Sequence, residues 1–262
     1  MEILLKDRRA LVCGSSRGIG KAIAIGLAAS GASITLISRN KEMLKKVAAE
    51  LDTSMGQVHD VISADFNEPH LVEKAVNNYL NEGKNIDILI NNTGGPSPGL
   101  AFESEPALYQ NAFSAHLIVN QILLQALLPH MQNQQFGRVI NIVSTSVKAP
   151  IPGLGVSNTI RGAVANWSKT LSAELAGFGI TVNNILPGLT KTDRLKNLIE
   201  SRAEAERITY MEMEDRMMKS VPAGRFADPE EIANVVVFLA SNKASYINGV
   251  SLSVDGGKTP VQ

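Results

Sequence analysis

This sequence has little cysteine, no excess of positive or negative charge, and no long apolar run. Its 262 residues include one cysteine, Cys13, which cannot form an internal disulfide and indicates a reducing compartment, so a cytoplasmic location is expected. Lys plus Arg and Asp plus Glu each number 25, which excludes the basic surface of a protein that binds nucleic acid or an anionic membrane. No apolar run approaches the length of a membrane span or of a signal peptide. The four histidines are scattered and form no metal-ligand pattern with the cysteine, so no metal is expected.

Short apolar runs that alternate with helical patterns are abundant instead. Hydrophobic residues make up 44% of the chain, which is enough for a substantial core. Strands are predicted at residues 9–13, 33–37, 56–63, 86–90, 138–143, 181–186 and 250–254. Helices are predicted at residues 21–30, 41–51, 68–82, 156–178 and 229–240, with a further long helix that ends near Pro129. Because the strands are apolar throughout, we predict one α/β domain over residues 1–262, with a doubly wound parallel sheet of the Rossmann type covered on both faces. The polar, Met-rich residues 190–220 follow a strand end and are predicted to be a substrate lid.

A glycine-rich turn joins the first predicted strand to the first helix. It spans residues 14–20, with Gly14 for the tight turn, Gly18 for close approach to a ligand, and Gly20 for packing of the helix on the strand. The N-terminus of a helix offers unpaired N–H groups to an anion. The turn therefore predicts a phosphate-binding site.

Charge at the end of the second strand indicates which dinucleotide would bind. A carboxylate there would hydrogen-bond a ribose diol, whereas a cation favours a 2′-phosphate. The sequence has Ser38-Arg39-Asn40, and Arg17 within the glycine turn is placed to reach the same phosphate. The cofactor is predicted to be NADP(H).

Several motifs occur in an order and spacing that resemble the short-chain dehydrogenase/reductases. Within them the chain is most similar to the ketoacyl-carrier-protein reductases and to a related branch whose Tyr, Lys and Asn catalytic positions depart from the usual set. The motifs are the Gly14/Gly18/Gly20 turn, Asn91–Gly94, Leu128–Met131, Gly137–Asn141, Pro187-Gly188 and Val254–Gly257. The resemblance implies strand order 3-2-1-4-5-6-7, a homotetramer, a small-molecule substrate, and hydride transfer between a nicotinamide and a carbonyl or alcohol. It also implies that Asp65 contacts the adenine amino group, that Asn91 and Gly94 line the cofactor, and that Pro187, Gly188 and Thr192 lie near the carboxamide. The cofactor-binding residues are thus expected to be Gly14, Ser16, Arg17, Gly18, Ile19, Gly20, Arg39, Asn40, Asp65, Asn91, Gly94, Pro187, Gly188 and Thr192.

The catalytic positions depart from those of the family. The family set is an Asn, a Ser, a Tyr and a Lys, with the Tyr and Lys four residues apart and the Ser thirteen residues before the Tyr. Laid on this chain, these positions are His116, Ser144, Ser157 and Arg161. Only the serine is retained.

Each change alters the proton chemistry. An aliphatic hydroxyl at Ser157 is a weaker acid than a phenol by about 5 pKa units, a loss on the order of 7 kcal/mol of driving force. Arg161 stays protonated and cannot relay protons, but it can bond a nicotinamide ribose or bind a carboxylate or phosphate. His116 is either a replacement acid or a structural residue of an apolar helix. Tyr109 and Tyr210 are alternative sources of a phenol.

Two hypotheses about function follow. The first is an NADP(H)-dependent oxidoreductase that acts on a carbonyl compound, with an acyl thioester as one candidate, and that uses a non-standard proton donor. The second is a nucleotide-binding relative that has lost the ancestral reaction and acts by binding a partner. Haloalcohol dehalogenases also place an arginine at the lysine position, but they keep the tyrosine and lose the glycine loop, so they match less well. Because the glycine turn and both arginines are present, we favour the oxidoreductase.

Overall fold

Seven parallel strands form a single sheet in the computed structural model, which describes residues 3–260. The strands are β1 (Arg9–Cys13), β2 (Ser33–Ser38), β3 (Asp60–Ser63), β4 (Ile88–Asn91), β5 (Gly137–Ile142), β6 (Ile180–Pro187) and β7 (Ser251–Val254). They pair in the order β3-β2-β1-β4-β5-β6-β7, and every pair is parallel. The predicted fold class and strand order are confirmed.

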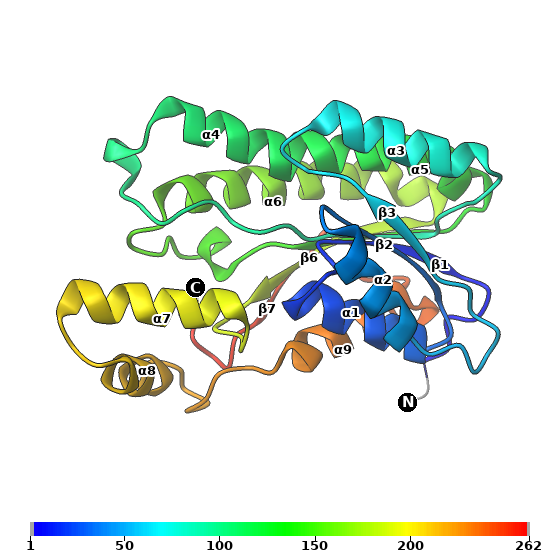
Figure 1. The fold of residues 1–262 in the computed structure, drawn as a ribbon. Coiled ribbons are helices and arrows are strands. Elements are labelled where there is room, and N and C mark those ends of the chain that lie inside the picture. The colour runs from blue at the N-terminus through cyan, green and yellow to red at the C-terminus, as the bar shows by residue number, and fades with distance from the viewer. Residues whose placement is uncertain (1–2, 261–262) are drawn as a thin grey trace.

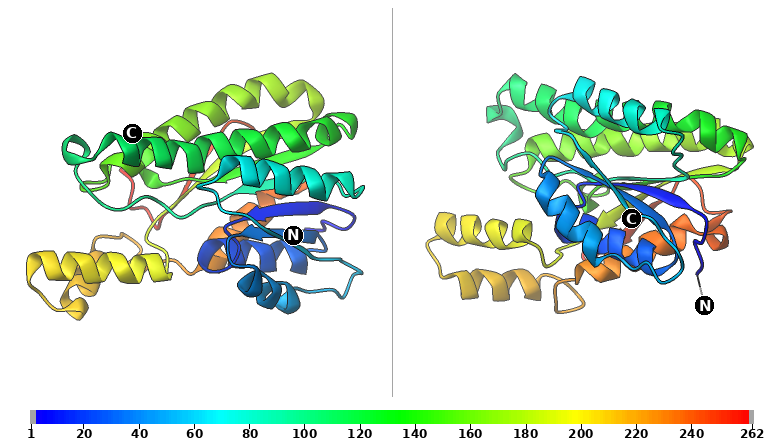
Figure 2. Two further views of the ribbon diagram at one scale, coloured as in Figure 1. Left: turned by 45° about the horizontal axis from the view of Figure 1, so that its top comes forward. Right: turned by 45° about the vertical axis from the view of Figure 1, so that its right-hand side comes forward.

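Helices cover both faces of this sheet (Figures 1 and 2). One layer contains α1 (Gly18–Ala29), α2 (Lys41–Glu50) and α9 (Pro229–Ala240), and the other contains α3 (Pro69–Asn81), α4 (Pro106–Phe113), α5 (Val119–Asn133) and α6 (Gly155–Leu175). Side chains of β1 alternate between the two cores: Ala10 and Val12 pack in one, and Leu11 and Cys13 in the other. The central strands are mostly apolar because both of their faces are buried, although β5 and β6 also hold the buried polar residues Asn141, Asn183 and Asn184.

The predicted boundaries are wrong in two places. Strand β3 begins at Asp60 and not at Gly56, because Gly56 has φ +86° and turns the chain. The helix expected to end near Pro129 continues to Asn133. Pro129 is exposed, and so is Gln125, whose carbonyl loses its helical partner and can bond solvent instead. The buried Met131 holds the last turn on the core.

One helical run within the described residues is long and apolar enough to cross a membrane. Pro106–Asn133 has 28 residues, and an 18-residue window within it has a mean hydropathy of 1.3, so the expectation that no stretch reaches such a length needs correction. Length and composition are its only membrane-like features. Leu123, Leu127 and Met131 of this run are buried in the core beside the sheet, as in an ordinary core helix.

The last pair of helices before α9 projects from the body. Helices α7 (Asp193–Glu206) and α8 (Tyr210–Lys219) lie side by side, away from the two helical layers (Figures 1 and 2). They share a small core of their own, made of Leu195, Ile199, Ala203, Met213, Met217 and Phe226. The predicted insert is therefore a helical hairpin with separate packing.

Candidate cofactor and catalytic cleft

The carboxyl ends of the central strands open onto a cleft of about 2050 Å³. Every residue that the sequence assigned to cofactor binding or catalysis lines this cleft, except Asn91. Asn91 lines a cavity of about 10 Å³ that shares Thr93, His116 and Arg161 with the cleft. Ligands of open parallel sheets bind at this end of the strands. The fold thus gathers segments from the whole chain into one site large enough for a dinucleotide and a substrate.

The glycine turn has the geometry of an anion-binding loop. Gly14 and Gly18 have φ +58° and +55°, and a Cβ on Gly20 would lie 2.3 Å from the carbonyl oxygen of Gly14. No side chain caps the start of α1 at Arg17, and no acidic residue occupies its first turn. The free N–H groups at this helix end fit the pyrophosphate of a dinucleotide.

The two arginines expected at the 2′-phosphate each have a carboxylate neighbour. Arg17 Nη1 lies 3.2 Å from Asp193 Oδ2 on α7, and Arg39 Nη1 lies 3.8 Å from Asp65 Oδ2. Both arginine side chains are at least 70% exposed, so these pairs are weak and exchangeable. Asn40 caps α2, because its Oδ1 accepts a hydrogen bond from the Met43 N–H at 3.0 Å.

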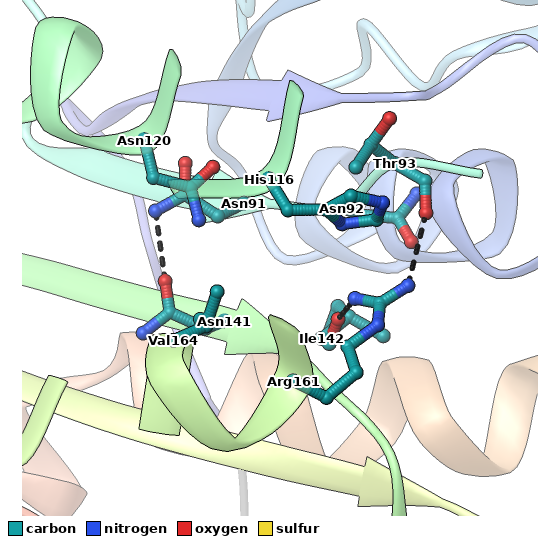
Figure 3. Close-up of a pocket in the computed structure, with 9 residues that line it drawn as sticks. All are labelled: Asn91, Asn92, Thr93, His116, Asn120, Asn141, Ile142, Arg161 and Val164. Atoms are coloured by element: carbon teal, nitrogen blue, oxygen red, sulfur yellow. Dashed lines mark hydrogen bonds between the residues drawn. The ribbon is translucent and has the colours of Figure 1, made fainter. Parts of the chain in front are cut away.

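Helix α6 brings two of the altered catalytic positions to the cleft. Ser157 and Arg161 are one turn apart and are only 6% and 9% exposed. Arg161 Nη1 donates to the Ile142 carbonyl at 2.9 Å, and its Nη2 donates to the Thr93 carbonyl at 3.4 Å (Figure 3). The Ser144 hydroxyl accepts from the Ser146 N–H at 3.1 Å, whereas the Ser157 hydroxyl has no partner among the described residues.

His116 reaches the same region from a π-helical turn, Ser114–Ile118, between α4 and α5. Such turns often occur at functional sites. The ring is 3% exposed, and its pKa is lowered to about 2, mainly by burial and then by the charge of Arg161, despite a hydrogen bond with the Gly94 backbone. The ring is therefore neutral near neutral pH, which disfavours the role of replacement acid.

Comparison with known proteins agrees with this geometry. The profile of the family described as enoyl-(acyl carrier protein) reductase matches residues 14–259. The chain belongs to the short-chain dehydrogenase/reductase family. It is 32% identical to the 3-oxoacyl-[acyl-carrier-protein] reductase FabG of Aquifex aeolicus, over 98% of this chain and 99% of the relative. It is 30% identical to the NADPH-dependent reductase BacG of Bacillus subtilis, over 97% of this chain and 98% of the relative. The structure of L-sorbose reductase from Gluconobacter frateurii, complexed with NADPH and L-sorbose, superposes with a TM-score of 0.93 at 30% identity and covers both chains fully.

No tyrosine of the described chain takes the place of the family's phenol in this cleft. The Tyr109 hydroxyl donates to the Ala101 carbonyl at 3.1 Å, and Tyr210 packs against the core of the α7–α8 hairpin. Neither residue lines the cleft. Within residues 3–260 there is also no group of three His, Cys, Asp or Glu that could hold a metal.

Arg194 is a cleft residue that the sequence reasoning missed. The side chain is exposed at the cleft, its Nη1 donates to the Gly95 carbonyl at 3.2 Å, and partial desolvation lowers its pKa. A signal was present, because Arg194 occupies the first turn of α7, where a cation opposes the helix dipole. An arginine at such a position suggests a role outside the helix itself.

The depressed pKa of His116 predicts a loss of stability in acid. From about pH 7 to about pH 5 the unfolded chain binds a proton at this ring, whose ordinary pKa is 6.5, and the folded chain does not. The free energy of unfolding should therefore fall by about 2 kcal/mol through this group, and more as the pH falls further. Urea unfolding of wild type and His116→Asn at both pH values measures this. The fall with pH should be about 2 kcal/mol smaller in the variant, and an equal fall in both proteins would contradict the assignment.

Proposed function

We propose that this protein is an NADP(H)-dependent oxidoreductase that reduces a carbonyl compound without a tyrosine as proton donor. Family membership supports oxidoreductase chemistry, and two relatives with 30% identity, the NADPH-dependent reductase BacG and L-sorbose reductase complexed with NADPH, support NADPH as the cofactor. The observation that supports a donor other than tyrosine is that Ser144, Ser157 and Arg161 line one cleft, which no tyrosine of the described residues lines.

Different residues of the cleft would bind different parts of NADPH, which supplies the hydride. The start of α1 and the glycine turn would hold the pyrophosphate, Arg17 and Arg39 would bind the 2′-phosphate, and Asp65 would bind the adenine amino group. Gly94 would line the cofactor, and Asn91 would adjoin it through the small cavity that shares Thr93 with the cleft. Residues Pro187, Gly188 and Thr192 would lie near the carboxamide.

The serines orient the carbonyl and pass the proton. Both hydroxyls donate hydrogen bonds to the carbonyl oxygen, and the alkoxide formed by hydride addition takes a proton from Ser157, which regains one from the solvent in the open cleft. The nearby Arg161 cation stabilises the developing negative charge. Burial and the charge of Arg194 lower the pKa of Arg161 to about 10, so it keeps its charge near neutral pH.

The pH dependence of turnover tests this arrangement. Neither His116, with a pKa of about 2, nor Arg161, with a pKa of about 10, titrates near neutrality. With a panel of ketones, keto acids and 3-oxoacyl thioesters, NADPH oxidation should be nearly constant between about pH 5 and pH 9 and should decline as Arg161 loses its proton. Ser144→Ala/Ser157→Ala should lower kcat at least about 100-fold. An apparent pKa near 7 that persists in this double variant would refute the serine pathway.

The same panel of carbonyl compounds distinguishes the oxidoreductase from the alternative, a protein that only binds the nucleotide. A protein that only binds the nucleotide would show NADPH binding by calorimetry and no oxidation with any carbonyl compound. This outcome would favour an altered relative that acts through a partner, and the missing phenol is the observation that supports this alternative.

We also propose that residues 190–220 form a lid over the substrate. The α7–α8 hairpin has its own core, and its base meets the cleft through the Arg17–Asp193 pair and the bond from Arg194 to Gly95. Such a segment opens at low cost. Hydrogen exchange should show added protection in this hairpin when NADPH and an accepted carbonyl compound are bound. Unchanged exchange there, with protection gained at the glycine turn as a positive control, would contradict a lid.

The resemblance to the short-chain dehydrogenase/reductases supports two further proposals. The protein acts on a small molecule in the cytoplasm, and it assembles as a homotetramer. Analytical ultracentrifugation of the purified chain tests the assembly, and a monomer at the concentrations used for kinetics would refute it.

A further inference from the structure

Arg161 is a buried cation without a carboxylate partner. It is 9% exposed, and its two hydrogen bonds go to the neutral carbonyl groups of Ile142 and Thr93. It forms no ion pair with any described residue. A buried charge is costly unless an opposite charge compensates it. Because Arg161 lines the cleft, its missing counter-charge can come from a ligand.

A second guanidinium group lies at the same loop. Arg194 donates to the Gly95 carbonyl, two residues beyond the Thr93 carbonyl that Arg161 contacts. The two charges interact, since Arg194 lowers the pKa of Arg161. A Cβ on Gly95 would lie 2.6 Å from Arg194 Nη2, so the glycine makes room for this guanidinium. Arg194 lies in the first turn of α7, so the positive end of the helix dipole adds to the positive electrostatic potential at this loop.

The acidic residues of the cleft do not neutralise this pair. Asp193 and Asp65 lie against Arg17 and Arg39, and Glu206 pairs with Arg216. Glu230, at the start of α9, forms no ion pair with the described residues. The third titratable group at the loop, His116, is neutral. Arg161 and Arg194 therefore leave a local charge of about two positive units on one wall of the cleft.

We propose that Arg161 and Arg194 form a guanidinium pair that binds the carboxylate of the substrate, so that this protein reduces carbonyl compounds that are acids. The inference rests on the proposed reductase function and adds the substrate class. Arginine suits this role because its planar fork of N–H donors matches a carboxylate. A phosphate of the cofactor has the same chemistry, so the experiment must separate these two sources of negative charge.

Binding of matched unreactive probes to the NADP⁺ complex tests the pair without requiring turnover. By calorimetry, benzoate should bind at least about tenfold more tightly than benzamide, which has the same ring and no charge. Arg194→Gln should abolish this preference and leave the Kd of NADP⁺ unchanged. Arg194 makes a single hydrogen bond, to an exposed loop, so its loss does not threaten the fold.

Two further variants control for charge and position. Lys196→Gln removes one cation from an exposed site on α7 outside the cleft, and it should keep the preference for benzoate. Gly95→Ala keeps every charge but displaces the Arg194 guanidinium, and it should lose the preference. Equal binding of benzoate and benzamide by wild type would overturn the proposal. A large loss of NADP⁺ affinity in Arg194→Gln would also overturn it, because the anion would then be a cofactor phosphate.

Steady-state kinetics are a separate experiment, which tests the reductase function itself. With acetoacetate and methyl acetoacetate, Arg194→Gln should raise KM for the acid at least about tenfold and leave KM for the ester unchanged. Absence of turnover with either compound, together with selective benzoate binding, would count against reduction of these ketones and would leave the anion site supported. Equal effects on acid and ester would refute the anion site even in an active reductase.

Discussion

Replacing Arg39 with alanine is expected to weaken NADPH binding by about 10- to 100-fold and to leave NADH binding unchanged. The reason is the loss of one charge-assisted hydrogen bond to the 2′-phosphate, which contributes about 1.5 to 3 kcal/mol. Only NADPH carries this phosphate. Calorimetric titration of wild type and Arg39→Ala with both cofactors measures the effect.

Two further variants make this test specific. Lys46→Ala removes the same charge from an exposed position on α2 outside the cleft, and it should bind NADPH as wild type does. Asp193→Asn removes the carboxylate that holds Arg17 at 3.2 Å, so it should bind NADPH several-fold more tightly. Equal affinity of wild type for NADPH and NADH would contradict the assignment of both arginines.

The positions of the strands could be predicted because their cause is local and repeated, whereas their order is implied by the resemblance to the family. The central strands β1, β2 and β4 are short, mostly apolar runs, and burial of both faces removes the alternation that a half-exposed strand would show. The glycine turn could be predicted for a similar reason, since Gly14 and Gly18 adopt positive φ angles that other residues rarely accept.

The parts that could not be predicted depend on contacts between distant segments. The carboxylate neighbours of Arg17 and Arg39 lie on α7 and after β3, and nothing in the spacing of the sequence indicates either pair. The neutral state of His116 follows from its burial and from Arg161, which is 45 residues away in the chain. The bond from Arg194 to Gly95 joins residues separated by 99 positions. Sequence patterns report periodicity and local turns, whereas these interactions exist only after the sheet has assembled.

Restoring the family's catalytic set is expected to raise the reduction of acetoacetyl thioesters by NADPH at least about 100-fold. The triple variant Ser157→Tyr/Arg161→Lys/His116→Asn supplies a phenol, and a positioned general acid contributes about 100- to 10,000-fold. Ser157→Tyr alone should help little, because Arg161 is bulkier than lysine and its guanidinium is held at the Thr93 carbonyl. The effects should therefore be strongly non-additive, as for residues that act as a unit.

The triple variant also relates the proton donor to substrate choice. Because it removes Arg161, it should lose the preference for benzoate over benzamide while it gains activity on the uncharged thioester. Calorimetry with NADPH and urea unfolding establish that each variant is folded and binds cofactor before its rate is compared. A folded, NADPH-bound triple variant with no gain on acetoacetyl thioesters would mean that the pocket itself has diverged, and the altered residues would then not be the cause of low activity. Wild type could instead turn over this thioester rapidly and lose that activity in Ser144→Ala and in Arg161→Ala. This result would also refute the expectation, because the residues already present would then suffice for catalysis.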